Sequence, residues 1–157
     1  MNDTFAPNLE EYEIIKKIAA SSNDGPVLMI NINKYSPEAG FPNGEPYSEW
    51  MKVLATLVDQ VGAKLLWKVP VLGQPVGLQA ADEILGAWYP SHKSFLSLRD
   101  QPASEESFRL RNLCVLEAVV HRCPENIIPK GSDDLQVDIG KNFKLSGFHL
   151  CLVQIFY

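Results

Sequence analysis

Apolar and polar residues follow two periods along the chain, and each change of period marks an expected element. Apolar residues three and four positions apart predict helices over 8–20 and 47–61, with Trp50 on the buried stripe and Gly62 after the last turn. Shorter runs rich in β-branched and aromatic residues predict strands. We expect these strands at residues 25–34, 63–73, 83–89 and 113–121.

The remaining helical pattern is split by a proline. Ser91 is a good N-cap for residues 92–100, Pro102 interrupts, and a more charged helical pattern resumes over 103–112. The predicted order is a helix followed by β-α-β-β-α-β. This order predicts an α+β, ferredoxin-like fold, in which helices cover one face of a four-stranded antiparallel sheet.

The division of the chain follows from this order. We expect a helical extension over residues 1–24, the ferredoxin-like domain over 25–124, and an atypical tail over 125–157. The uncovered face of the sheet should carry too many apolar side chains for water, Val27 and Met29 among them. The sequence therefore predicts a homodimer that buries this face.

Composition excludes several classes of protein. The chain has 157 residues, of which 46% are hydrophobic and 21% charged, and this fits one globular domain. A formal net charge of −5 argues against a nucleic-acid partner. The sequence offers neither a secretory signal nor an apolar run long enough for a bilayer. Three cysteines without paired spacing suit a reducing compartment, so we expect a cytoplasmic protein without a membrane partner.

Two asparagines make the first strand unusual. Side chains alternate along a strand, so Asn31 and Asn33 fall late in the row that Val27 and Met29 begin. A ligand-facing strand end explains them, and so does ordinary turn chemistry at the end of a strand. Both explanations stay open at this point.

Six residues form the predicted site of a small organic molecule. His92 and Arg111 are the catalytic candidates, and the substrate-binding candidates are Asn31, Asn33, Trp67 and Tyr89. Each has a simpler explanation. His92 can be an exposed helix-start histidine, Arg111 can pair with a nearby glutamate, and the aromatic residues can belong to the core. The three histidines are scattered, so we expect neither a metal nor a cofactor.

Four blocks of sequence carry a resemblance to a known family. These are GPVLMININK, EPYSEWMKVLATLVDQVGAKLLWKVPVLG, EILGAWYPSHKSFLSLRDQP and RLRNLCVLEA. Over residues 8–123 the chain resembles the longer members of domain-of-unknown-function family 1330. The resemblance implies a dimeric α/β barrel with a pocket between sheet and helices, but no particular reaction.

More distant members of this fold class include cofactor-independent monooxygenases and polyketide cyclases. Plant-type cyclases place a histidine after the proline of the split helix, whereas this chain has Pro102-Ala103-Ser104. The cyclase mechanism is therefore in doubt. The function expected first is the binding of a small molecule, with cofactor-independent proton transfer or oxygen chemistry. The alternative is a non-catalytic dimerisation or interaction module.

Overall fold

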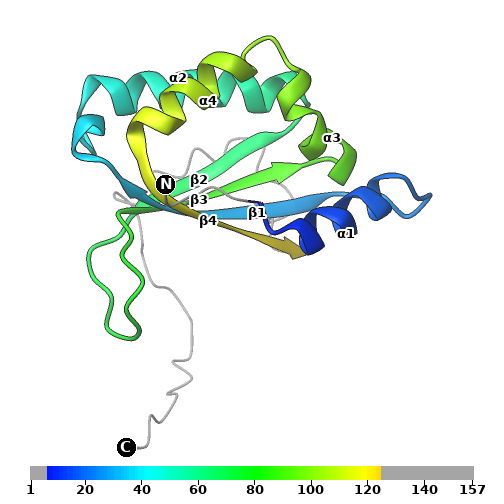
Figure 1. Ribbon diagram of the computed structural model, residues 1–157, viewed down its shortest axis with the longest axis horizontal. Coiled ribbons are helices and arrows are strands. Elements are labelled where there is room, and N and C mark those ends of the chain that lie inside the picture. Colours follow the sequence, from blue (N-terminus) through cyan, green and yellow to red (C-terminus); the bar gives the residue numbers. More distant parts are fainter. Residues whose placement is uncertain (1–6, 125–157) are drawn as a thin grey trace, which may run out of the picture.

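The computed structural model describes residues 7–124, which form a twisted sheet with helices on one side (Figure 1). Within these residues the sheet has four antiparallel strands in the order β2-β3-β1-β4. The strands are β1 (Val27–Tyr35), β2 (Lys64–Pro70), β3 (Glu83–Tyr89) and β4 (Val115–Pro124). The predicted ferredoxin-like α+β fold is confirmed.

The helices occupy two places on the same side of the sheet (Figure 1). Helices α2 (Glu45–Gln60) and α4 (Ser104–Cys114) pack against each other across the sheet. Helices α1 (Leu9–Ala19) and α3 (His92–Leu96) contact each other at the end of the sheet where β1 begins. Two short 3₁₀ helices, η1 (Pro37–Ala39) and η2 (Ser97–Asp100), complete the connections.

The helix boundaries have local causes that the sequence announces. The Asn8 side chain accepts a hydrogen bond from the Glu11 amide at the start of α1, and Ser91 does the same for Ser94 in α3. Gly62 follows α2 with φ at 71°, a conformation that glycine adopts without strain. The predicted elements are therefore confirmed with small shifts at their ends.

One prediction about the faces of the sheet is wrong. Val27 and Met29 pack with Val58 of α2, so they lie under the helices and not on the open face. The open face carries the alternate row of β1, which contains Leu28, Ile30 and Ile32. Both rows begin with apolar residues, and the strand pattern alone does not say which row the helices cover.

Two clusters of buried side chains form the core on the helix side. The first joins α1, α2 and the starting end of β1, and its buried members are Ile15, Val27, Met29, Val58, Ala63, Ala87 and Tyr89. The second joins α2, α4 and the finishing end of β1, and its buried members are Tyr35, Ala39, Tyr47, Trp50, Leu110, Cys114 and Val115. Trp50 is therefore a core residue, as predicted.

Trp67 lies on the other face of the sheet, where its indole covers Gly86. A Cβ atom on Gly86 would lie 2.6 Å from the Trp67 ring, which confirms the close approach expected at this glycine. Among residues 7–124, no helix has the length and apolar character that crossing a membrane requires. The predicted tail over 125–157 lies outside the described residues.

Candidate functional site

Where β1 finishes, a buried carboxylate gathers polar side chains from four elements. Glu83 is the first residue of β3 and lies opposite Asn33 of β1 in the sheet. Its side chain is only 3% exposed. We call the group around it the Glu83 hub, and its members are Asn33, Tyr35, Tyr47, Lys68 and Glu83.

The hub is a chain of short hydrogen bonds. The Tyr35 hydroxyl donates to Glu83 Oε2 at 2.5 Å, and the Tyr47 hydroxyl donates to Glu83 Oε1 at 2.7 Å. Lys68 Nζ donates to the Tyr47 oxygen at 2.6 Å and lies 3.9 Å from Glu83 Oε1. The chain therefore leads from a partly exposed ammonium group to a buried carboxylate.

Burial and charge keep the two phenols protonated. Burial, and then the hydrogen bond and charge of Glu83, raise the pKa of Tyr35 and Tyr47 far above the usual value of 10.0. A hydrogen bond from the Asn33 side chain opposes the rise in the pKa of Tyr35. Both phenols are therefore hydrogen-bond donors at neutral pH, and the carboxylate is their acceptor.

Aromatic rings enclose the hub on the side of α2. Phe41 stacks on Tyr35 with 4.7 Å between ring centroids, while Tyr47 and Trp50 meet Tyr35 edge-on at 5.2 Å and 6.0 Å. Trp50 is buried, and its Nε1 has no hydrogen-bond partner in the described part of the chain. An unpaired buried N–H group is costly, so this is an unusual place for a purely structural tryptophan.

The loop between β1 and α2 holds Phe41 in place. A Cβ atom on Gly44 would lie 2.2 Å from the Ala39 carbonyl oxygen, so only glycine fits this tight closure. The loop borders a hollow of about 390 Å³. The residues lining it are Lys34, Tyr35, Ser36, Pro37, Gly40, Phe41, Asp82 and Leu116.

A larger hollow of about 580 Å³ runs along α4, but its chemistry is less suited to a site. Arg109 is already bound to Glu106 there by two hydrogen bonds of 2.7 Å. Arg99 lies over the Phe108 ring, 4.7 Å from its centroid. We therefore place the candidate site at the hollow beside the Glu83 hub, where a buried ionisable group lies close by.

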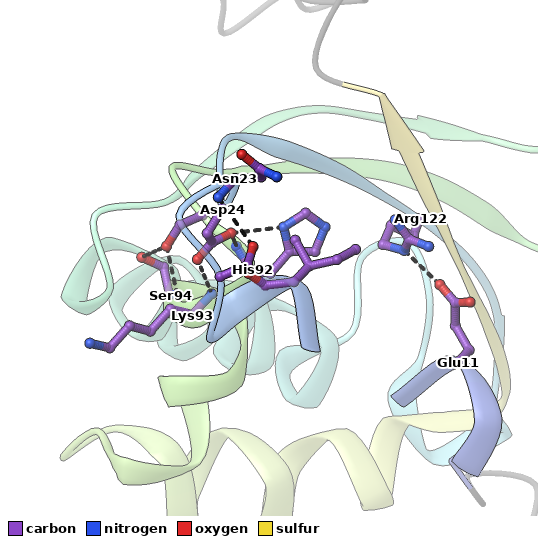
Figure 2. A network of polar contacts seen from close by, with 10 residues as sticks. Glu11, Asn23, Asp24, His92, Lys93, Ser94 and Arg122 are labelled. Atoms are coloured by element: carbon purple, nitrogen blue, oxygen red, sulfur yellow. Dashed lines mark hydrogen bonds and ion pairs between the residues drawn. The ribbon is translucent and has the colours of Figure 1, made fainter. Parts of the chain in front are cut away.

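A second buried carboxylate lies at the opposite end of β1 (Figure 2). Asp24 accepts hydrogen bonds from the His92 amide at 2.8 Å, the Lys93 amide at 3.1 Å and His92 Nδ1 at 2.9 Å. Burial would raise the pKa of Asp24, but these hydrogen bonds outweigh it and hold the pKa below its usual value of 3.8. Asp24 therefore remains a carboxylate that ties the start of β1 to α3.

The imidazole of His92 is fixed by this contact. Because an ionised Asp24 only accepts hydrogen bonds, Nδ1 of His92 carries the proton between them. The ring lies between Asp24 and Arg122 in Figure 2, and Arg122 Nε donates to Glu11 at 2.5 Å. His92 is buried and not exposed as its simpler explanation required, and within residues 7–124 its Nε2 has no hydrogen-bond partner.

The six residues predicted to share one pocket are dispersed. Trp67 lies on the open face, because it pairs with Gly86, which in turn pairs with Ile30. Asn33 belongs to the Glu83 hub, while Asn31 donates to the Met29 carbonyl at 3.3 Å. The prediction of one shared pocket is therefore wrong, although the individual roles stay predictions.

The other three candidates lie away from the hub. Tyr89 packs edge-on against Phe95 in the first core cluster, with ring centroids 5.3 Å apart. His92 is near the start of β1, which the rise per strand residue places about 20 Å from Asn33. Arg111 is on α4, where burial and then the charge of Arg99 lower the pKa of its guanidinium. The contacts of His92 are with Asp24, so no catalytic pair with Arg111 is formed.

Sequence reasoning missed most of the hub. Tyr47 fell on the apolar stripe of a helix and was counted as core, and Glu83 was only the first letter of a strand. Tyr35 and Lys68 carried no motif. The single available signal was the pair of asparagines in β1, which pointed to the correct end of the strand. Among residues 7–124, no group of three potential metal ligands gathers in one place.

Comparisons with known proteins agree with the architecture. No protein-family model matches the chain, and no curated protein does either. The crystal structure of RPA0582, a protein of unknown function from Rhodopseudomonas palustris, aligns with a TM-score of 0.62 and 22% identity over 79% of this chain and 97% of that one. The methylated RPA0582 protein aligns with the same score and identity over 80% and 96%.

A plant protein shares the architecture at a greater distance. At3g17210 from Arabidopsis thaliana aligns with a TM-score of 0.51 and 13% identity, over 66% of this chain and 98% of that one. At these identities the likeness shows the fold alone.

Proposed function

We propose that this protein binds a small organic molecule in the hollow beside the Glu83 hub and transfers protons without a cofactor. The observation that carries the proposal is the buried Glu83 carboxylate, which holds two phenol protons next to that hollow. A mostly apolar hollow with a few polar groups suits a small organic ligand. Ionisable groups with shifted pKa values often mark functional sites.

The hub supports a specific route for a proton. Tyr35 lines the hollow and donates to Glu83. A proton leaving the ligand passes to the Tyr35 oxygen while the Tyr35 proton passes to Glu83, so the phenol is restored. Lys68 and Tyr47 connect the same carboxylate to the solvent side. Glu83 thus takes the base role first assigned to His92 with Arg111.

A thermal-shift screen of metabolites tests the proposal with two matched variants. Ligand at 100 times its dissociation constant stabilises a folded protein by about 2.7 kcal/mol, which is readily detected. Tyr35→Phe should reduce the shift produced by a hit, because the proton donor in the hollow is lost. Tyr12→Phe, the same change on partly exposed α1, should leave the shift unaltered. Absence of any stabilising ligand, or equal shifts in Tyr35→Phe and wild type, would contradict the proposal.

The resemblance to family 1330 supports a cytoplasmic homodimer, and a second candidate function rests on the same surface. No helix in the described residues covers the open face of the sheet (Figure 1). Its apolar side chains include Ile30, Ile32, Trp67, Ile84, Trp88 and Val119. The loop over 71–82 projects beyond this face, and its Leu72, Val76 and Leu78 are exposed (Figure 1). These features favour a dimerisation or interaction module.

Sedimentation at micromolar concentration separates the two candidates from each other. A dimer that buries the open face should dissociate when Ile32→Lys places a charge in its centre. Glu105→Lys, on the exposed side of α4, is the matched control and should leave the mass unchanged. A wild-type protein that sediments as a monomer would remove the homodimer and the module together. Ligand binding in the hollow would then stand alone.

A further inference from the structure

Lys68 brings an ammonium group to the buried Glu83 without binding it tightly. Its Nζ lies 4.8 Å from the centroid of the Tyr47 ring and 3.9 Å from Glu83 Oε1. Direct bonds between an ammonium and a carboxylate are about 2.7–2.9 Å long. The ammonium group is therefore near the carboxylate but not in contact with it.

The two partners differ in how firmly they are held. The Glu83 side chain is 3% exposed and fixed by two phenols, whereas the Lys68 side chain is 50% exposed on the edge strand β2. An ion pair with so exposed a partner contributes little to stability, so Lys68 leaves it at low cost. The flexible stem of lysine allows its ammonium group to turn into solvent. What stays behind is a carboxylate beside an aromatic ring.

We infer that this position binds the ammonium group of a ligand and that Lys68 is a placeholder for it. The inference rests on the proposed function and names its ligand class, a primary amine carried on a flat apolar body. Glu83 supplies the opposite charge, and the face of Tyr47 supplies a cation–π contact. The second lone pair on each Glu83 oxygen is open to the N–H groups of the amine.

The charges of the hub exclude other ligand heads. Both phenol protons are already directed at Glu83, so neither is available to a second acceptor without breaking a short hydrogen bond. A ligand carboxylate would face Glu83 and be repelled. An alcohol would gain a hydrogen bond but no charge attraction. The order of affinity at this position is therefore amine, alcohol, carboxylate.

Three probes that share one aromatic body test this order. Phenethylamine, 2-phenylethanol and phenylacetate are titrated by calorimetry into wild type, Lys68→Met and Lys68→Arg. Lys68→Met keeps the apolar stem and removes the competing charge, and its exposed position makes misfolding a small risk. It should bind phenethylamine about tenfold more tightly than wild type, as expected for one charge-assisted contact. Lys68→Arg keeps a cation in place and should not gain affinity.

Location is checked by nuclear Overhauser contacts between the probe and the Tyr47 ring in Lys68→Met. Contacts to Tyr47, together with the amine preference, support the inference. Equal affinity of Lys68→Met and wild type for phenethylamine overturns it, and so does tighter binding of the alcohol or the carboxylate. The metabolite screen with Tyr35→Phe is independent of these titrations. A hit there without an amine preference here would leave the proposed function standing and the placeholder role of Lys68 refuted.

Discussion

Both ends of the central strand β1 bury a carboxylate, yet the hydrogen-bond donors around the two are of different kinds. Asp24 receives two backbone N–H groups and one ring N–H group. Glu83 receives two phenol O–H groups, with an ammonium group behind one of them. Backbone amides do not ionise, whereas phenols do. The Asp24 end is therefore built as a joint, and the Glu83 end is built to exchange protons.

The elements that supply the donors reinforce this contrast. At the Asp24 end, α3 has five residues, and its first two amides are fixed by the same carboxylate. At the Glu83 end, every partner is a side chain, drawn from β1, β2 and α2. Side-chain networks respond to one another more than isolated contacts do. The following experiments test whether the two ends differ in this way.

The largest effect is expected from Glu83→Met, because it leaves two buried phenols without an acceptor. The free energy of unfolding should fall by about 3 kcal/mol, measured by urea denaturation. In a Tyr35→Phe/Tyr47→Phe background the same change should cost less than half as much, since no donor is then stranded. Glu105→Met on the surface of α4 is the control, with a loss below about 0.5 kcal/mol. Additive costs in the two backgrounds would refute the hub as a coupled network.

Alkaline pH should weaken the Glu83 end next. The pKa values of Tyr35 and Tyr47 are raised in the folded protein, so their stabilising contribution is present below the unfolded value of 10.0 and is lost as pH rises above it. Linkage gives a loss of about 1.4 kcal/mol for each phenol by pH 11. Urea denaturation from pH 8 to 11 measures this loss. The Tyr35→Phe/Tyr47→Phe variant should show a smaller decline, and parallel curves would contradict the assignment.

The two ends also differ in how far the sequence announced them. The caps at Asn8 and Ser91, the stripe of α2 and the glycine at position 62 are local signals, and all were readable. Asp24 and His92 are 68 positions apart, and Tyr35 and Glu83 are 48 apart. Such pairs depend on strand register, which no local pattern fixes when both rows of β1 are apolar. Asn33 was found because a polar residue inside an apolar strand is itself a signal.

A smaller effect is expected at the Asp24 end, where Asp24→Ala removes the acceptor of two amides of α3. We expect a loss of about 1–2 kcal/mol at pH 7, as for the loss of a helix cap. The pKa of Asp24 is lowered on folding, so its contribution is present above the unfolded value of 3.8 and disappears as pH falls through the folded value. The difference between wild type and Asp24→Ala should therefore shrink below about pH 4. A difference that grows in acid would refute this role.

The smallest effect is expected for the ion pair that joins α1 to β4 near Asp24 (Figure 2). Glu11→Gln removes the charge opposite Arg122, and both side chains are about one third exposed. Solvent screens such pairs, so the loss should stay below about 0.5 kcal/mol and vanish in 1 M salt. Histidine hydrogen exchange at His92, followed by mass spectrometry, should match wild type, because Asp24 and not the ion pair fixes the imidazole. Faster exchange would show that α1 shields His92 through this pair, and the Asp24 end would then depend on side chains as the Glu83 end does.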